Sequence, residues 1–134
     1  VHTHQPMATL LGIVELPILP LLHVQAAVVA QQPVPPFACA ELIVSPAQGR
    51  AVAAALGQHR VCHLQGHGIV SVGQSVPEAT LGAIHLERLA DVNYRVAQLG
   101  REPRVIPPQE IEALQKQLAS PAGRWAYYSE LAST

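Results

Sequence analysis

The sequence predicts a single α/β domain in which a sheet lies between helices. Strand-like apolar runs flank a glycine turn at residues 65–68, segments with a helical repeat of apolar residues alternate with them, and proline or glycine separates the segments. The chain has 134 residues, 49% of them hydrophobic. It is therefore long and apolar enough to bury one core.

The first third of the chain is its most apolar part. Residues 6–13 and 19–30 are predicted to form two short buried helices with a proline-broken turn between them. Glu15, Pro17 and His23 interrupt this stretch, and such residues are costly in lipid, so we expect no membrane span. Residues 33–37 are rich in proline and are expected at a sheet edge or in a crossing loop.

The middle of the chain is predicted to supply most of the sheet. A strand is expected at residues 41–44, and a helix over residues 46–56 that ends at Gly57 follows it. Residues 61–64 and 69–72 are short apolar runs on either side of a glycine turn, a pattern typical of two paired strands.

The last part of the chain has a helical period. Ser75 and Glu78 match a capping box, and the apolar repeat that follows predicts a long helix over about residues 76–99, ended by Gly100. A last helix is predicted to begin after residues 107–108 and to run to about residue 119. The tail that contains Trp125 is expected to pack on the body of the domain.

Composition excludes several classes of protein. Charged residues make up 13% of the chain and the net charge is -1, so the basic footprint of a nucleic-acid binder is missing. Cys39 and Cys62 fit no metal spacing and are too few for a disulfide scaffold, which predicts a cytoplasmic protein. The chain starts at Val1 without a secretory signal, and we expect residues 1–134 to be one N-terminally truncated domain.

Histidine is the unusual residue of this sequence, with seven copies. His2 and His4 are two positions apart, and on a strand this spacing puts both rings on one face, where one metal ion can bind both. His67 is the best candidate for a third ligand, because Gly66 and Gly68 leave its ring uncrowded. Three imidazoles with an open position are typical of a catalytic site. Zn²⁺ is the first candidate, with Mn²⁺, Fe²⁺ and Co²⁺ as alternatives.

The other histidines and a central glutamate have simpler interpretations. A lone histidine is more often a core or surface residue than a ligand, and we assign that role to His59, His63 and His85. His23 lies in an apolar segment near a proline turn, and both a core role and a site role stay open for it. Glu87 lies within the long helix, where a solvated or helix-pairing carboxylate is expected rather than a ligand or base.

These residues in this order resemble the class II aldolase/adducin family over roughly residues 1–115. The resemblance rests on the H-x-H start, the segment that reaches His23, and an H-G-x-x-x-x-G run about sixty residues after the start. It implies a three-layer α/β/α domain with a mostly antiparallel central sheet and active sites near subunit boundaries in a homotetramer. It also implies a divalent metal held by three histidines, matched here by His2, His4 and His67. Members of the family carry phosphate-binding loops and a glutamate acid-base ahead of the H-x-H strand.

The resemblance also bears on the reaction. In sugar-phosphate aldolases of the family a tyrosine follows the histidine that matches His23, whereas Val24 stands here. Residues 42–57 and the aromatic tail look more like members that decarboxylate hydroxylated aromatic acids. We therefore expect a divalent-metal-dependent carbon-carbon lyase that works through a metal-stabilised enolate, by decarboxylation of a hydroxylated acid or by aldol cleavage.

The expected substrate is a small molecule with vicinal oxygens, and His23 is the candidate catalytic residue that binds it or transfers a proton. Two other functions stay open. One is a non-catalytic adducin-type interaction module, whose relatives tend to lose the metal histidines. The other is a sugar-phosphate 4-epimerase built on the same retro-aldol step.

Overall fold

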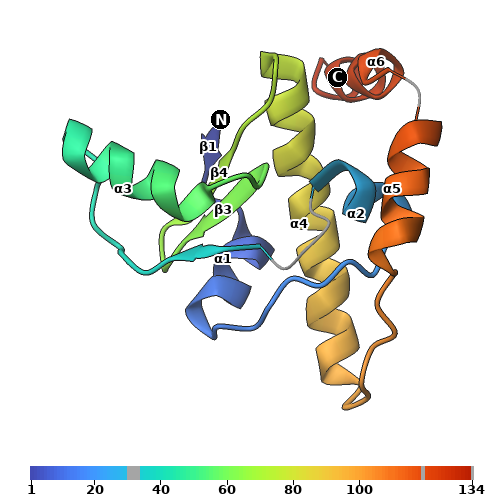
Figure 1. The fold of residues 1–134 in the computed structure, drawn as a ribbon, viewed down its shortest axis with the longest axis horizontal. Helices are drawn as coiled ribbons and strands as arrows, with labels where there is room; N and C mark the ends of the chain where they lie inside the picture. The colour runs from blue at the N-terminus through green and yellow to red at the C-terminus, as the bar shows by residue number, and fades with distance from the viewer. Residues whose placement is uncertain (30–33, 119, 134) are drawn as a thin grey trace.

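The computed structural model describes residues 1–29, 34–118 and 120–133. Within them the sheet strands follow the spatial order β1-β4-β3-β2 (Figure 1). The elements in chain order are β1 (His2–Thr3), α1 (Pro6–Ile13), α2 (His23–Val29), β2 (Pro36–Phe37), α3 (Pro46–Leu56), β3 (Val61–Leu64), β4 (Gly68–Ser71), α4 (Val76–Gln98), α5 (Pro108–Gln117) and α6 (Ala122–Leu131).

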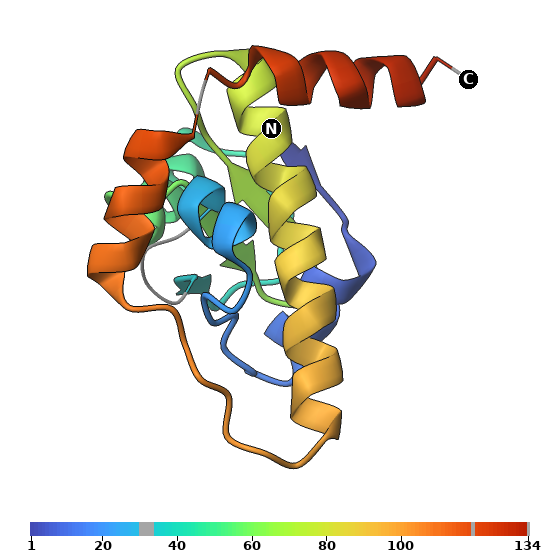
Figure 2. The same ribbon diagram turned by 90° about the vertical axis from the view of Figure 1, so that its right-hand side faces the viewer.

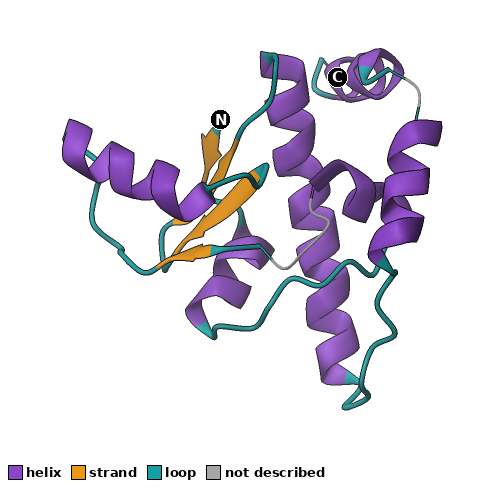
Figure 3. Cartoon of the chain, in the orientation of Figure 1, coloured by secondary structure: helices purple, strands orange, loops and turns teal. Residues whose placement is uncertain are grey.

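Helices cover both faces of the sheet, as the sequence predicts. Helix α3 packs on β2 and β3 from one side, whereas α1 and α4 pack on β3 and β4 from the other (Figures 1 and 3). Helix α2 lies against α4 and α5 (Figure 2). The three-layer α/β/α prediction is confirmed, with the helical layer thicker on the α4 side.

The sheet is mixed, and the expectation of a mostly antiparallel sheet is wrong. Strand β4 is antiparallel to both β1 and β3, but β2 is parallel to β3, with Pro36 opposite His63. The parallel pair arises because α3 connects β2 to β3, and a helical crossover returns the chain in the same direction. The proline-rich segment does form a sheet edge, although residue 33 lies outside the described part of the chain.

The strand expected at residues 41–44 does not form. Leu42 and Val44 are 70% and 81% exposed, and this stretch leads from β2 into α3 as irregular chain. The N–H groups of Val44 and Ser45 donate to the side-chain oxygen of Gln48, and Ser45 accepts from the Gln48 N–H. These groups therefore cap α3 instead of pairing with a strand.

The predicted helix over residues 6–13 is confirmed, but α2 starts four residues later than expected. The side chain of Asn93 on α4 accepts from the Leu19 N–H and donates to the Leu19 carbonyl, both at 2.9 Å. These two bonds hold residue 19 extended, and Pro20 follows it. The last residue of the expected helix, residue 30, lies outside the described residues.

The long helix is confirmed within one residue, but its capping differs from the prediction. Ser75 accepts from the Glu78 N–H, as a capping box requires. The Glu78 carboxylate accepts from the Gln74 N–H at 2.8 Å and pairs with Arg60 instead of bonding the Ser75 amide. No helix in the described part of the chain is long and apolar enough to cross a membrane.

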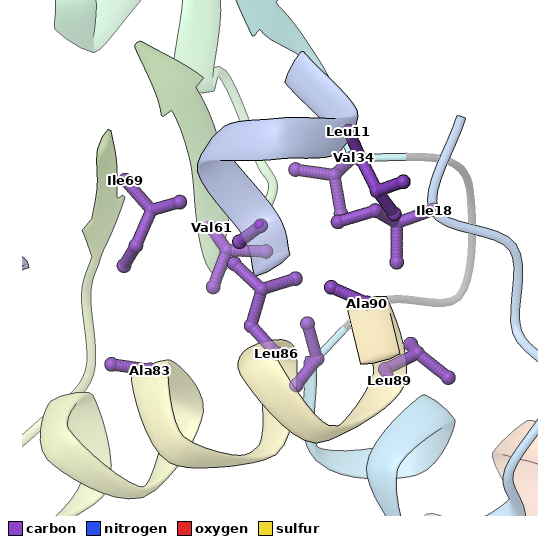
Figure 4. Close-up of a cluster of buried hydrophobic side chains, with 11 residues drawn as sticks. Leu11, Ile18, Val34, Val61, Ile69, Ala83, Leu86, Leu89 and Ala90 are labelled. Carbon is purple, nitrogen blue, oxygen red and sulfur yellow. The ribbon is translucent and has the colours of Figure 1, made fainter. Parts of the chain in front are cut away.

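The main core lies between the sheet and α4. Leu86 and Leu89 of α4 meet Leu11 of α1 and Val61 and Ile69 of the strands, all at most 1% exposed (Figure 4). The C-terminal tail forms α6, a helix that the sequence pattern did not indicate, and α6 packs on the first turns of α4 with its far end projecting (Figure 2).

Candidate metal centre

The three histidines selected from the sequence lie together at one end of the sheet. Pairing of β1 with β4 places His2 opposite Val70, and His67 lies in the turn that leads into β4. One nitrogen from each of His2, His4 and His67 lies within 4.8 Å of the other two. The ring centroids are 4.8 to 4.9 Å apart. The strand spacing of His2 and His4 therefore produces the convergence that it predicts.

A backbone contact orients the ring of His2. Its Nδ1–H donates to the Ile69 carbonyl at 2.8 Å, so the lone pair lies on Nε2. That Nε2 is 3.1 Å from Nε2 of His4. A histidine whose second nitrogen is held by a carbonyl is typical of metal ligands, because the bond fixes both the tautomer and the ring direction.

Two glycines shape the turn that carries His67. Gly66 has a φ of 63°, in the left-handed region that glycine adopts at least cost. Gly68 lies against β1, and a Cβ there would be 2.3 Å from the Thr3 carbonyl oxygen and 3.1 Å from Cδ2 of His4. The glycines thus do more than leave the His67 ring uncrowded, because Gly68 allows the close approach that brings His4 to it.

The electrostatic environment favours the neutral form of His67. Desolvation lowers the pKa of His67 below its ordinary value of 6.5, and the charges of His2 and His4 lower the pKa further. Nδ1 of His67 is buried and has no hydrogen-bond partner among the described residues. A cluster of three imidazoles with an unsatisfied nitrogen on His67 fits a borderline divalent ion such as Zn²⁺, because an imidazole binds a metal as a neutral ligand and leaves the ion its full charge.

An open pocket of about 580 Å³ adjoins the three rings. Its walls come from Leu42, Ile43 and Val44 before α3, from Val52 within α3, and from Leu64 and Val70 on the sheet. No Lys or Arg stands among the described residues that line it. Sequence reasoning missed this wall because it assigned residues 42–44 to a strand, although an apolar run just before a helix cap was its signal.

His23 does not join this cluster in its own chain. It is the exposed first residue of α2, which packs on α4 and α5, whereas the pocket opens on the α3 side of the sheet. The other histidines are also separate from the three rings. His63 and His85 are buried, and Nδ1 of His59 is 3.2 Å from the Leu56 carbonyl.

Glu87 has a structural role. Its two carboxylate oxygens accept from the backbone N–H groups of Met7 and Ala8, at 2.8 and 2.9 Å. These are amides of the first turn of α1, which has no side-chain cap of its own. The helix-pairing interpretation is confirmed, because α4 caps α1 through this carboxylate.

Fold and site together define a three-layer α/β/α domain with three converging histidines at one end of its sheet. Residues 1–94 match the class II aldolase and adducin N-terminal domain family, and the chain belongs to that family.

Curated relatives include two lyases. The chain is 37% identical over 102 residues to a 3,4-dihydroxyphthalate decarboxylase of Rhodococcus jostii (strain RHA1), an alignment that covers 74% of this chain and 42% of that protein. It is 31% identical over 112 residues to the 5-methylthioribulose-1-phosphate/5-deoxyribulose-1-phosphate aldolase of Rhodospirillum rubrum, covering 84% of this chain and 49% of that protein. The chain thus spans less than half the length of these relatives.

Solved structures agree on the fold. An L-fuculose 1-phosphate aldolase superposes with a TM-score of 0.72 at 25% identity, over 87% of this chain and 53% of that one. The L-fuculose-1-phosphate aldolase of Thermus thermophilus gives a TM-score of 0.61 at 28% identity, over 78% and 56%. The relatives and structures named here are thus a decarboxylase and aldolases.

Proposed function

We propose that the protein containing this chain is a divalent-metal-dependent carbon-carbon lyase that decarboxylates a hydroxylated aromatic acid. The observation that carries the proposal is the convergence of His2, His4 and His67 beside an apolar pocket. In this assignment the three imidazoles hold the ion, which is Zn²⁺ by first preference and otherwise Mn²⁺, Fe²⁺ or Co²⁺. When bound, the ion supplies Lewis-acid stabilisation of the electron pair left on carbon as the bond breaks.

The pocket wall favours an aromatic acid over a sugar phosphate. Leu42, Val44 and Val52 offer apolar surface to a ring. Val24 offers no acidic proton where resembling aldolases place a tyrosine. The relative from Rhodococcus jostii, named as a dihydroxyphthalate decarboxylase, agrees with this choice.

We assign proton transfer to His23 across a subunit boundary. In its own chain His23 is exposed on α2, behind the sheet from the three rings. Only a neighbouring copy can bring this side chain to the pocket, so the assignment requires an oligomer, for which the tetramer implied by the family resemblance is the natural form. Light scattering that shows a stable monomer at high concentration would contradict the assignment.

Aldol cleavage is the second candidate, favoured by the aldolase from Rhodospirillum rubrum and by the fuculose-phosphate aldolase structures. Both reactions leave an electron pair on carbon, so the metal assignment does not separate them. The substrates separate them: an aldolase needs a phosphate-binding element, and a decarboxylase needs a surface for its ring.

The test is an assay of the natural protein that contains this chain, expressed at full length and loaded with Zn²⁺ or Mn²⁺. Fuculose 1-phosphate is followed by aldehyde release and a panel of dihydroxylated aromatic acids by CO₂ release. We expect CO₂ from at least one acid and little aldehyde, with the metal near one equivalent per chain by elemental analysis. Efficient aldol cleavage without CO₂ would favour the second candidate, and no bound metal and no turnover would favour an adducin-type module.

A further inference from the structure

The described fold does not require a glycine at position 49. Gly49 lies within α3, where its N–H donates to the Ser45 carbonyl at 3.0 Å. Its φ is outside the left-handed region that Gly66 occupies. A Cβ at Gly49 would meet no described atom within 4 Å beyond its chain neighbours and its own helix backbone, in contrast to the close approach at Gly68. Because glycine destabilises a helix relative to alanine, alanine would be the better residue for α3 alone.

The open space beside Gly49 belongs to the pocket of the candidate metal centre. Gly49 lines that pocket together with His2, His4 and His67. Val52 also lines it, and residues three apart in a helix share a face, so the bare backbone of α3 at Gly49 faces the pocket. A larger side chain here would therefore occupy pocket volume and leave the described packing undisturbed.

The surfaces around Gly49 are open to a ligand. Gly49 is exposed, and Leu42 and Val44 on the same pocket wall are 70% and 81% exposed. His2 and His4 are exposed as well. A ligand in this pocket can therefore contact the apolar wall and the imidazole rings without displacing a core side chain.

We propose that Gly49 is a specificity-determining residue of the candidate metal centre, which admits the flat ring of an aromatic substrate against α3. The inference rests on the proposed function and deepens it by naming the residue that selects the ring. A planar ring can lie against a helix that lacks a Cβ, and its contacts with Leu42 and Val44 remove apolar surface from water. The vicinal oxygens at the edge of the ring are then left for the end of the pocket that holds the three histidines.

The experiment measures ligand binding to the full-length, Zn²⁺-loaded protein by isothermal titration calorimetry. The first probe is 4-nitrocatechol, which has a ring and two vicinal oxygens, and the second is acetohydroxamate, which offers two oxygens without a ring. We expect Gly49→Leu to weaken 4-nitrocatechol binding by at least about tenfold, a typical cost of overpacking, and to leave acetohydroxamate within about twofold. Gly49→Ala should weaken 4-nitrocatechol binding to a smaller extent.

The matched control is Gly123→Leu. Gly123 is also a helix glycine with open space for a Cβ, but it lies on α6 and is not among the described residues that line the pocket. This variant should change neither affinity. Elemental analysis should find the same Zn²⁺ content in every variant, because no described atom of the three imidazole rings lies within 4 Å of a Cβ at position 49.

Urea unfolding tests whether protein, and not a ligand, fills the space beside Gly49. If the space is open in the full-length protein, Gly49→Ala should raise the urea midpoint, since alanine favours the helix. A lower midpoint would show that another part of the protein packs against Gly49, and the proposal would then be wrong.

Three binding results would also overturn the proposal: no binding of 4-nitrocatechol, unchanged 4-nitrocatechol affinity in Gly49→Leu, and an equal loss of both probes. If Gly49→Leu loses Zn²⁺ or its fold, the smaller Gly49→Val decides the outcome. Failure of the proposed function is a different result, in which the unaltered protein holds no Zn²⁺ or releases no CO₂ from any aromatic acid, and this inference fails with it. Unchanged probe affinities in a Zn²⁺-loaded, decarboxylating protein reject the role of Gly49 alone.

Discussion

Gly68 lies so close to Thr3 that a Cβ on the glycine would be 2.3 Å from the Thr3 carbonyl oxygen. Real Cβ atoms do not approach a backbone oxygen this closely, so any other residue at position 68 must move β1 away from β4. Because Thr3 stands between His2 and His4, this movement separates their rings from His67. The lack of a Cβ at Gly68 therefore allows His2 and His4 to lie close to His67.

We expect Gly68→Ala to weaken Zn²⁺ binding by at least about tenfold, since displaced supporting groups typically cost a metal site 10- to 100-fold in affinity. It should also reduce the free energy of unfolding by about 1 to 3 kcal/mol, as overpacking does. Competition with a chromogenic chelator measures the first change and urea unfolding the second. Gly123→Ala is the matched control, because a Cβ there would meet no described atom within 4 Å beyond its chain neighbours and its own helix backbone, and it should leave Zn²⁺ affinity unchanged.

Local patterns in the sequence were sufficient for most of the fold. Period and capping signals predict the helices at residues 6–13, 46–56 and about 76–99, because caps and apolar stripes are properties of neighbouring residues. The failures depend on distant contacts. Residues 41–44 have strand-like composition but no ladder partner, and α2 starts late because Asn93, seventy-four positions away, holds Leu19 extended.

The double variant His2→Ala/His4→Ala should lose metal binding and keep its fold. Both side chains are exposed and lie at the end of a two-residue strand, outside the core cluster. Elemental analysis after dialysis should find less than about a tenth of an equivalent of Zn²⁺, because one remaining imidazole is a weak site. The circular dichroism spectrum should match that of the unaltered protein, and full metal content in the variant would exclude these ligands.

The candidate site was predictable in part for the same reason as the fold. An H-x-H pair on a strand is a local signal, and His67 stood out through its glycines. The apolar run at residues 42–44 is visible in the sequence, but its place in the pocket wall depends on how α3 meets the sheet. The contact of the Ile69 carbonyl with His2 depends in the same way on how β1 meets β4.

A variant of Glu87 distinguishes a structural role of this carboxylate from a catalytic one. We expect Glu87→Gln to lower the free energy of unfolding by about 1 to 2 kcal/mol, because the amide has one acceptor oxygen for the two N–H groups of Met7 and Ala8. Zn²⁺ affinity should stay within twofold. A large loss of metal or of turnover in a variant of unchanged stability would return Glu87 to the list of catalytic candidates.

Buried histidines should make the fold sensitive to acid. Desolvation, followed by the charge of Arg124, lowers the pKa of His85 in the folded protein, and desolvation lowers the pKa of His63. The unfolded chain binds protons near the ordinary value of 6.5, so below that pH it takes up more protons than the folded chain. The free energy of unfolding should therefore fall as pH decreases from 6.5, and this effect is absent above it.

Urea unfolding of the unaltered protein and of His85→Leu at pH 7.5 and pH 5.5 measures this effect. The variant should lose less stability between the two pH values, and adding His63→Leu should flatten the dependence further. Parallel losses in all three proteins would show that these histidines do not cause the acid sensitivity.

The last prediction tests whether His23 acts across a subunit boundary. In one chain His23 begins α2 on the α4 side of the sheet, whereas His67 lies with the other candidate metal ligands on the α3 side. The proposed site therefore needs the two residues from different copies. His23→Asn and His67→Asn should each abolish decarboxylation in the full-length protein. The two variants are then mixed, unfolded and refolded together. The mixture should recover activity, because about a quarter of the shared sites then combine an intact His67 from one copy with an intact His23 from another.

Each variant refolded alone is the control and should stay inactive. If His23→Asn alone keeps full activity, His23 has no part in proton transfer. If the mixture stays inactive although both variants fold and assemble, the two residues do not share a site between subunits.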